Sequence, residues 1–260
     1  MLKVRVIPTL LWKDVGLVKG VSFDSWRRVG PVLPAIKVYN ARDVDELILL
    51  DITASLEHRG PDTQSVADFA AECSVPFTVG GGIRTADHIS NLLRAGADKV
   101  ALNTALYEAP WVVDEAARRY GSQCVVASID ARRSGPGGYT CVSRAGSVDA
   151  GRDPLDVARE AVDRGAGEIL ITSVDRDGTM TGYDIDLLRC LSALPVPVIA
   201  SGGAGTYADL IAAVRAGGAS AVAAASMFHF TEQTPAGAKA ALHEAGVPVR
   251  HQFAAALSQS

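Results

Sequence analysis

Short apolar runs rich in valine, isoleucine and leucine recur along the chain, and amphipathic stretches with helical spacing separate them. Apolar runs of this length are typical of buried strands, while apolar residues three and four positions apart are typical of helices that pack by one face. Strands that alternate with helices favour a parallel sheet joined by crossover helices. The pattern predicts strands near residues 4–10, 46–51, 76–79, 99–103, 124–130, 168–173, 197–201 and 221–226.

The second half of the chain repeats the first at a distance of about 120 residues. VGGGIRTADHISNLLRAGADKVALNTALY around Gly80 matches ASGGAGTYADLIAAVRAGGASAVAAASMFHF around Ser201, and DELILLDITAS matches GEILITSVDRD. Strand–helix units in two repeated halves predict a single closed (βα)8 TIM barrel, an α/β fold with its functional residues at the carboxyl ends of the strands. We expect residues 1–250 to form this barrel and residues 251–260 to form a C-terminal tail.

Composition and charge narrow the class of function. The 260 residues are 48% hydrophobic and 21% charged, as in a soluble globular protein, and the formal net charge is −4. A basic surface that binds nucleic acid is therefore not expected. We also expect no membrane segment, and four scattered cysteines without C-x-x-C spacing indicate reduced thiols in a cytoplasmic protein. The histidines form no metal-binding pattern, so neither a metal nor a cofactor is expected.

Two glycine-rich segments, Gly80–Gly82 and Ser201–Gly203, each lie between a predicted strand and a predicted helix. Glycine lets backbone N–H groups approach a phosphate, and the amino terminus of a helix favours its negative charge. Because the repeat relates the two segments, we expect a ligand with a phosphate at each end, spanning the barrel mouth. The predicted phosphate-binding residues are Gly81, Gly82, Asn103, Thr104, Asp177, Gly178, Ser201, Gly202, Gly203 and Ser226.

The longest loop expected at the mouth follows the first strand and runs from Leu11 to about Pro31. It contains glycines beside lysines, above all Lys19 and Gly20. This composition is compatible with a mobile lid over an anionic ligand and equally with a solvated connection.

Carboxylates end two of the predicted strands, at Asp51 and Asp130, and Asp175 and Asp177 follow the sixth strand. A carboxylate at the carboxyl end of a barrel strand favours a catalytic role, so Asp130 and Asp51 are the catalytic candidates. The repeat places Leu11 opposite Asp130, and a symmetric pair of carboxylates would need an acid there. Either only one half ever used its position, or an ancestral base was lost.

Four charged residues fall near the amino-terminal ends of strands, at the opposite end of the predicted barrel. Buried charge is expensive unless it is paired, so two cations and two anions are expected to form a ring at the barrel floor. The ring is either a structural plug of salt bridges or a gate that admits a small neutral molecule. Its members are Arg5, Glu46, Lys99 and Glu168.

Taken together, these segments resemble the HisF family, the cyclase subunits of imidazole glycerol phosphate synthase, over residues 1–250. The matching stretches include DELILLDITAS, FTVGGGIRT, AGADKVALNTA, GAGEILITSVDRDGT and PVIASGGAG. The resemblance implies that a glutaminase docks at the barrel floor, that its ammonia crosses the barrel, and that the substrate carries two phosphates. It further implies an ammonia gate at Arg5, Glu46, Lys99 and Glu168, a partner interface at Asp98, and catalytic aspartates at position 11 and Asp130.

The chain departs from the HisF pattern at Leu11, where the family has an aspartate. Leucine transfers no proton, so ring closure would need Asp51, Asp14 or Asp177 as a substitute. The opening IPTLLWKDVGLVK and the stretch VGPVLPAIKVYNARDVDEL resemble a branch of the family that serves acetamidino-sugar modification. By contrast, FHFTEQTPAGAKAALHEAGVPVR resembles the ending of ordinary HisF proteins.

Three functions are therefore considered. The main hypothesis is a HisF-like synthase subunit that takes ammonia from a HisH-like glutaminase for amidine-type C–N bond formation in sugar or secondary metabolism, with a sugar amidotransferase as an optional further partner. The first alternative is the cyclase subunit (a lyase) of imidazole glycerol phosphate synthase in histidine biosynthesis. The second alternative is a non-catalytic ammonia conduit or scaffold.

Overall fold

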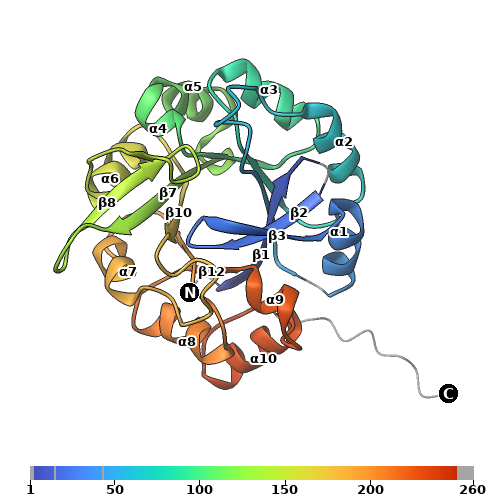
Figure 1. The fold of residues 1–260 in the computed structure, drawn as a ribbon, viewed down its shortest axis with the longest axis vertical. Helices are drawn as coiled ribbons and strands as arrows, with labels where there is room; N and C mark the ends of the chain where they lie inside the picture. The colour runs from blue at the N-terminus through green and yellow to red at the C-terminus, as the bar shows by residue number, and fades with distance from the viewer. Residues whose placement is uncertain (1–2, 15, 43, 251–260) are drawn as a thin grey trace.

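The computed structural model describes residues 3–14, 16–42 and 44–250, so the tail predicted at residues 251–260 lies outside the described residues. A parallel barrel closes within this part of the chain, with helices around its outside (Figure 1), which confirms the predicted TIM barrel. Pairing of β12 with β1 and of β7 with β10 completes the circle. The barrel strands are β1 (Arg5–Lys13), β4 (Leu47–Asp51), β5 (Phe77–Gly80), β6 (Lys99–Leu102), β7 (Val125–Arg133), β10 (Glu168–Ser173), β11 (Val198–Ser201) and β12 (Ala221–Ala224).

Helices on the outside connect successive barrel strands. The repeat is visible in their ends: Thr85 caps α3 and Thr206 caps α8 by accepting a backbone N–H through its side chain. No helix among the described residues has the length and apolarity needed to cross a bilayer. The helices are α1 (Val32–Ala41), α2 (Thr63–Ala71), α3 (Ala86–Arg94), α4 (Ala105–Glu108), α5 (Trp111–Tyr120), α6 (Pro154–Asp163), α7 (Ile185–Leu191), α8 (Tyr207–Arg215), α9 (Ser226–Phe230) and α10 (Pro235–Glu244), with a 3₁₀ turn η1 (Ser122–Cys124).

The first strand of each half is longer than predicted, because it continues into antiparallel strands above the barrel. After β1 come β2 (Gly16–Val21) and β3 (Asp24–Gly30), and after β7 come β8 (Tyr139–Ser143) and β9 (Val148–Asp149). The segment expected to be a loop after the first strand is therefore mostly a β-hairpin. Its backbone groups pair with β1 in register, Leu11 opposite Val18, which its glycines and lysines did not suggest.

Side chains inside the barrel form three levels along its axis. Because successive residues of a strand point to opposite faces, every second residue faces inward. The four charged residues of the ring lie at the floor, and polar side chains lie at the mouth. An apolar level lies between them, and a larger core fills the space between strands and helices. The apolar level consists of Ile7, Ile48, Ala101, Val126, Leu170, Ile199, Ala221 and Ala223.

Candidate functional site

The barrel mouth holds a pocket under the β2–β3 hairpin, which lies across the strand ends in Figure 1. Residues that are far apart in the sequence and belong to both halves line this pocket. Every predicted phosphate-binding residue is among them, together with Leu11, Lys19, Asp51 and Asp130. Those phosphate candidates are Gly81, Gly82, Asn103, Thr104, Asp177, Gly178, Ser201, Gly202, Gly203 and Ser226.

The two glycine segments have similar backbone geometry. Gly81 and Gly202 both have positive φ, and a Cβ would lie 2.3 Å from the carbonyl oxygen of Asp51 or 2.6 Å from that of Ser173. Only glycine fits such a position without strain. Equivalent strand ends therefore hold two equivalent loops open toward one pocket, as the repeat predicted.

The helices that begin without a side-chain cap differ from the ones expected to hold phosphate. Side chains already cap α3 and α8, which directly follow the glycine segments. The short helices α4 and α9 begin one strand later, beside Thr104 and Ser226, and neither has a side-chain cap. The helix starts beside the pocket that no side chain caps therefore belong to α4 and α9.

Asp130 faces into the barrel from β7 and lines the pocket. Its Oδ2 accepts a hydrogen bond of 3.1 Å from Nδ2 of Asn103, whose amide also donates to the carbonyl oxygen of Ser128 at 2.9 Å. Burial raises the pKa of Asp130 to about 7, and the charge of Asp177 adds to this rise, while a hydrogen bond from Thr172 opposes it. A carboxyl group with this pKa exists in both protonation states near neutral pH.

Lys19 closes the β2–β3 hairpin, or lid, onto the loop after β10. Its Nζ lies 2.7 Å from both carboxylate oxygens of Asp177, and both side chains are buried. The backbone N–H of Ser22 also donates to the carbonyl oxygen of Asp177 at 2.8 Å. Gly20 leaves no room for a side chain, because a Cβ would lie 2.2 Å from the carbonyl oxygen of Asp24. The predicted lid residues Lys19 and Gly20 thus lie in the segment that covers the pocket, and their role in a mobile lid stays a prediction.

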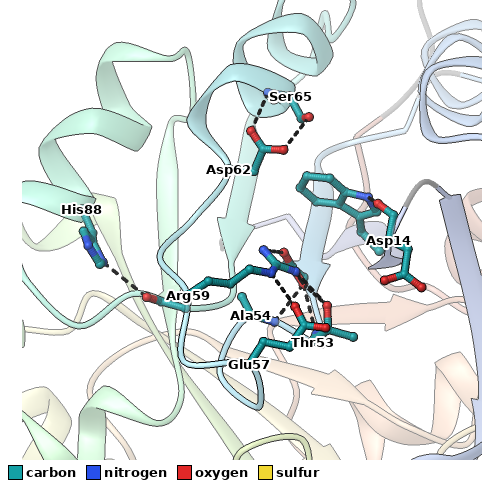
Figure 2. A network of polar contacts seen from close by, with 11 residues as sticks. Asp14, Thr53, Ala54, Glu57, Arg59, Asp62, Ser65 and His88 are labelled. Carbon is teal, nitrogen blue, oxygen red and sulfur yellow. Dashed lines mark hydrogen bonds and ion pairs between the residues drawn. The ribbon is translucent and has the colours of Figure 1, made fainter.

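Asp51 is occupied by contacts within its own loop, whose residues Thr53, Ala54 and Arg59 lie close together in Figure 2. Its Oδ1 accepts from the backbone N–H groups of Thr53 and Ala54, each at 3.0 Å, and its Oδ2 lies 2.7 Å from Nη1 of Arg59. The hydrogen bond to Asp51 is also the main reason that the pKa of Arg59 is raised. The catalytic role predicted for Asp51 stays a prediction, and these contacts favour a structural role. Asp14, another proposed substitute, is exposed.

Leu11 places hydrocarbon where a second carboxylate was sought. It is 9% exposed, faces the pocket, and is in register with Leu50 on β4. The mouth therefore has an apolar wall on the β1–β4 side and an acid on the β7 side. The halves differ chemically although their backbones match.

The four charged residues at the floor form a closed ring of alternating sign. Arg5 Nη1 lies 2.7 Å from Glu46 and 3.1 Å from Glu168, and Lys99 Nζ lies 2.9 Å from each. Burial alone would lower the pKa of Arg5, but the two glutamates outweigh it and raise the pKa. The predicted ring is thus formed, whereas its role as plug or gate stays a prediction.

Comparison with known proteins gives a family match and two close relatives. Residues 5–234 match the family model described as histidine biosynthesis protein. The chain is 49% identical over 252 residues to imidazole glycerol phosphate synthase subunit HisF of Gluconacetobacter diazotrophicus, covering 96% of this chain and 97% of that protein. It is 51% identical over 251 residues to the subunit of the same name from Hyphomonas neptunium, covering 96% and 99%.

The chain belongs to the HisF family. The resemblance inferred from its motifs is thereby confirmed. The placement in the acetamidino-sugar branch is not supported, because both relatives carry the name of the histidine-pathway synthase subunit. About 50% identity over nearly the whole chain is stronger evidence than the resemblance of two short stretches to that branch.

Several residues that line the pocket of this HisF-family chain were not predicted from the sequence. Phe23 and Trp26 project from the lid into the pocket lining, and aromatic residues in an otherwise polar segment were an available signal. Thr9 and Ser128 also line the pocket, each two residues before a position that was singled out, and the period of two could have found them. Arg59 gave no signal, because its role depends on a loop that folds back onto Asp51.

The sequence also singled out Asp98 and Asp175. Asp98 is exposed near the start of β6 at the barrel floor, where its Oδ2 accepts the backbone N–H of Phe77 at 2.8 Å. Asp175 is exposed and accepts the backbone N–H of Arg133 at 2.8 Å. Within the described residues, no group of three or more His, Cys, Asp and Glu side chains is placed to hold a metal ion.

Proposed function

We propose that this chain is the cyclase subunit of an imidazole glycerol phosphate synthase, a lyase that uses ammonia supplied by a glutaminase subunit. One observation carries the proposal: Asp130, with a pKa of about 7, shares one pocket with two equivalent glycine loops. Such a pocket fits a substrate with a phosphate at each end and an acid–base reaction between them. The names of the two relatives support the same reaction.

Asp130 is the proposed acid–base group. Forming a C–N bond from ammonia requires loss of a proton from nitrogen and, later, a proton for the departing group. A carboxyl group with a pKa near the working pH serves both steps in turn, and Asn103 fixes its orientation. Leu11 cannot share this work, so a single acid is expected to catalyse ring closure more slowly than a pair.

Ammonia is proposed to enter at the floor and leave at the mouth. The charged ring is one level below the apolar level, and the apolar level is one level below the pocket. Apolar surroundings disfavour ammonium far more than neutral ammonia, so the apolar level selects the reactive form. A glutaminase docked at the floor, where Asp98 is exposed, would supply ammonia at the ring.

Leu11 favours one second candidate, ammonia-dependent amidine formation on a sugar amide, because that chemistry closes no ring. Only Leu11 and the resemblance of the opening segments support it, so it ranks after the cyclase. The conduit hypothesis ranks third, since a conduit has no use for a pKa of about 7 at Asp130.

The test is turnover of the histidine-pathway bisphosphate by the purified chain with ammonium salts, measured as imidazole glycerol phosphate formed. We expect product from the natural chain and about 10²–10⁴-fold faster formation by Leu11→Asp, the range for one general base. A phosphate-loop control, Gly202→Ala, should raise KM for the bisphosphate. Absence of product from both the natural chain and Leu11→Asp would exclude the cyclase function.

A further inference from the structure

Thr9 carries one of four buried hydroxyl groups that have no hydrogen-bond partner among the described residues. Thr9 is 7% exposed, and its Oγ1 is shielded from solvent and makes no hydrogen bond. Leaving a buried hydroxyl unpaired is unfavourable, and such groups in proteins nearly always have a partner. The unpaired oxygen therefore points to a ligand or water that binds it when the protein works.

The position of Thr9 identifies which ligand. On the inward face of β1, Thr9 lies two residues beyond Ile7 of the apolar level and two residues before Leu11 of the pocket wall. It is thus the first polar group that a molecule moving up the barrel along β1 would meet. Because Thr9 lies on β1, whereas the glycine segments follow β5 and β11, a small molecule inside the barrel fits its hydroxyl better than a phosphate held by those segments.

We propose that the Thr9 hydroxyl holds ammonia at the top of the apolar level before it attacks the substrate, an inference that rests on the proposed function. A threonine hydroxyl can donate or accept, and when Thr9 Oγ1 accepts one N–H of ammonia, the nitrogen lone pair stays free to face the substrate carbon. A hydroxyl suits this task because it is neutral and does not favour ammonium, as a carboxylate would. Thr9 is then a positioning residue for the nucleophile and has no role in phosphate binding.

The kinetic test uses Thr9→Val, which keeps the shape and removes the hydroxyl, and Thr9→Ser, which restores it. We expect Thr9→Val to raise KM for ammonia about 3- to 10-fold, the loss of one neutral hydrogen bond, while KM for the bisphosphate changes less than about twofold. Thr9→Ser should return KM for ammonia close to its natural value. The inference is wrong if Thr9→Val leaves KM for ammonia unchanged or raises only KM for the bisphosphate.

Ser226→Ala is the matched control, because Ser226 is a second pocket residue whose buried Oγ has no hydrogen bond. It lies at the start of α9, beside the second glycine loop, where phosphate is proposed to bind. Its removal should raise KM for the bisphosphate and leave KM for ammonia unchanged. Equal effects of both variants on both constants would overturn the separate role of Thr9.

A second measurement does not depend on turnover. In protein labelled with ¹³C at threonine methyl groups, the Thr9 signal is assigned by its loss in Thr9→Val and followed at pH 9 during addition of ammonium chloride. We expect a saturable shift of Thr9 that sodium chloride does not reproduce, with no shift of Thr53, whose hydroxyl is already bonded to Arg59. A missing or salt-reproduced shift overturns the inference. A saturable shift without turnover would leave it standing and remove the proposed function instead.

Discussion

Asp130→Asn separates the stability of the barrel from its chemistry. The carboxyl group lies in the mouth, where burial and the charge of Asp177 raise its pKa from 3.8 to about 7. Asparagine has nearly the same shape, and its amide oxygen can still accept the hydrogen bond from Asn103, but it cannot ionise. The substitution therefore removes one titration and little else.

The sign of the effect follows from proton binding. Between about pH 4 and pH 7 the folded protein keeps the proton on Asp130, whereas the unfolded chain has lost it, so the natural protein loses stability as pH rises. One pH unit is worth about 1.4 kcal/mol, which gives at most about 3 kcal/mol between pH 5 and pH 8. Because the side chain is partly exposed, solvent screening reduces this to about 1–2 kcal/mol.

Urea unfolding of both proteins at intervals from pH 5 to pH 8 measures this difference. Other groups titrate alike in the two proteins, so the free energy of unfolding of Asp130→Asn should gain about 1–2 kcal/mol relative to the natural chain, then level off. Asp175→Asn is the control, because Asp175 is exposed and should show no such gain. A flat difference, or one that grows toward acid, would refute the raised pKa. Turnover of Asp130→Asn should fall at least about 10²-fold.

Three further substitutions test the lid, the loop after β4 and the ring. Gly178→Ala should hold the lid open and raise KM for the proposed bisphosphate at least about tenfold. The reason is that Gly178 has a φ of +75°, and a Cβ there would lie 2.1 Å from the carbonyl oxygen of Gly20. An unchanged KM would contradict lid closure at this contact. Arg59→Ala should lower the free energy of unfolding, measured in urea, by about 2–3 kcal/mol, because buried Asp51 loses its cation. A loss below about 0.5 kcal/mol would contradict a stabilising role for the Arg59–Asp51 ion pair. Lys99→Met removes the contacts of Lys99 with Glu46 and Glu168 and so opens one side of the ring. It should reduce glutamine-dependent turnover with the proposed glutaminase more than turnover with ammonium salts. Equal losses in both assays would favour a structural plug.

The barrel and most of its mouth could be predicted from the sequence, because both follow from local periodicity and from the repeat. Inward positions occur at every second residue of a strand, so Asp130 and the glycine loops had to meet at one end. The ring at the floor followed from the same rule, since Arg5 and Lys99 begin their strands. Register within a closed barrel leaves little freedom at these positions.

Contacts that depend on folded loops could not be predicted. Asp51 looked equivalent to Asp130 at a strand end, but Arg59 lies in an irregular segment that returns to it. Lys19 and Asp177 are 158 residues apart, and only the docked lid brings them together. The segment after β1 was expected to be a loop and is mostly a β-hairpin, because cross-strand pairing decides the conformation of glycine-containing segments more than their composition does.

The ladder between β1 and β2 limits how the active site can open. Three register pairs, from Leu11 with Val18 to Lys13 with Gly16, tie the lid to a strand that cannot leave the barrel wall. Under the proposed function, entry and escape of a bisphosphate are therefore expected to require the hairpin to swing as a unit, which breaks the contact between Lys19 and Asp177. Collective motions of this size take microseconds to milliseconds. In Leu11→Asp, where the chemical step is expected to be faster, we therefore expect product release to limit the turnover rate.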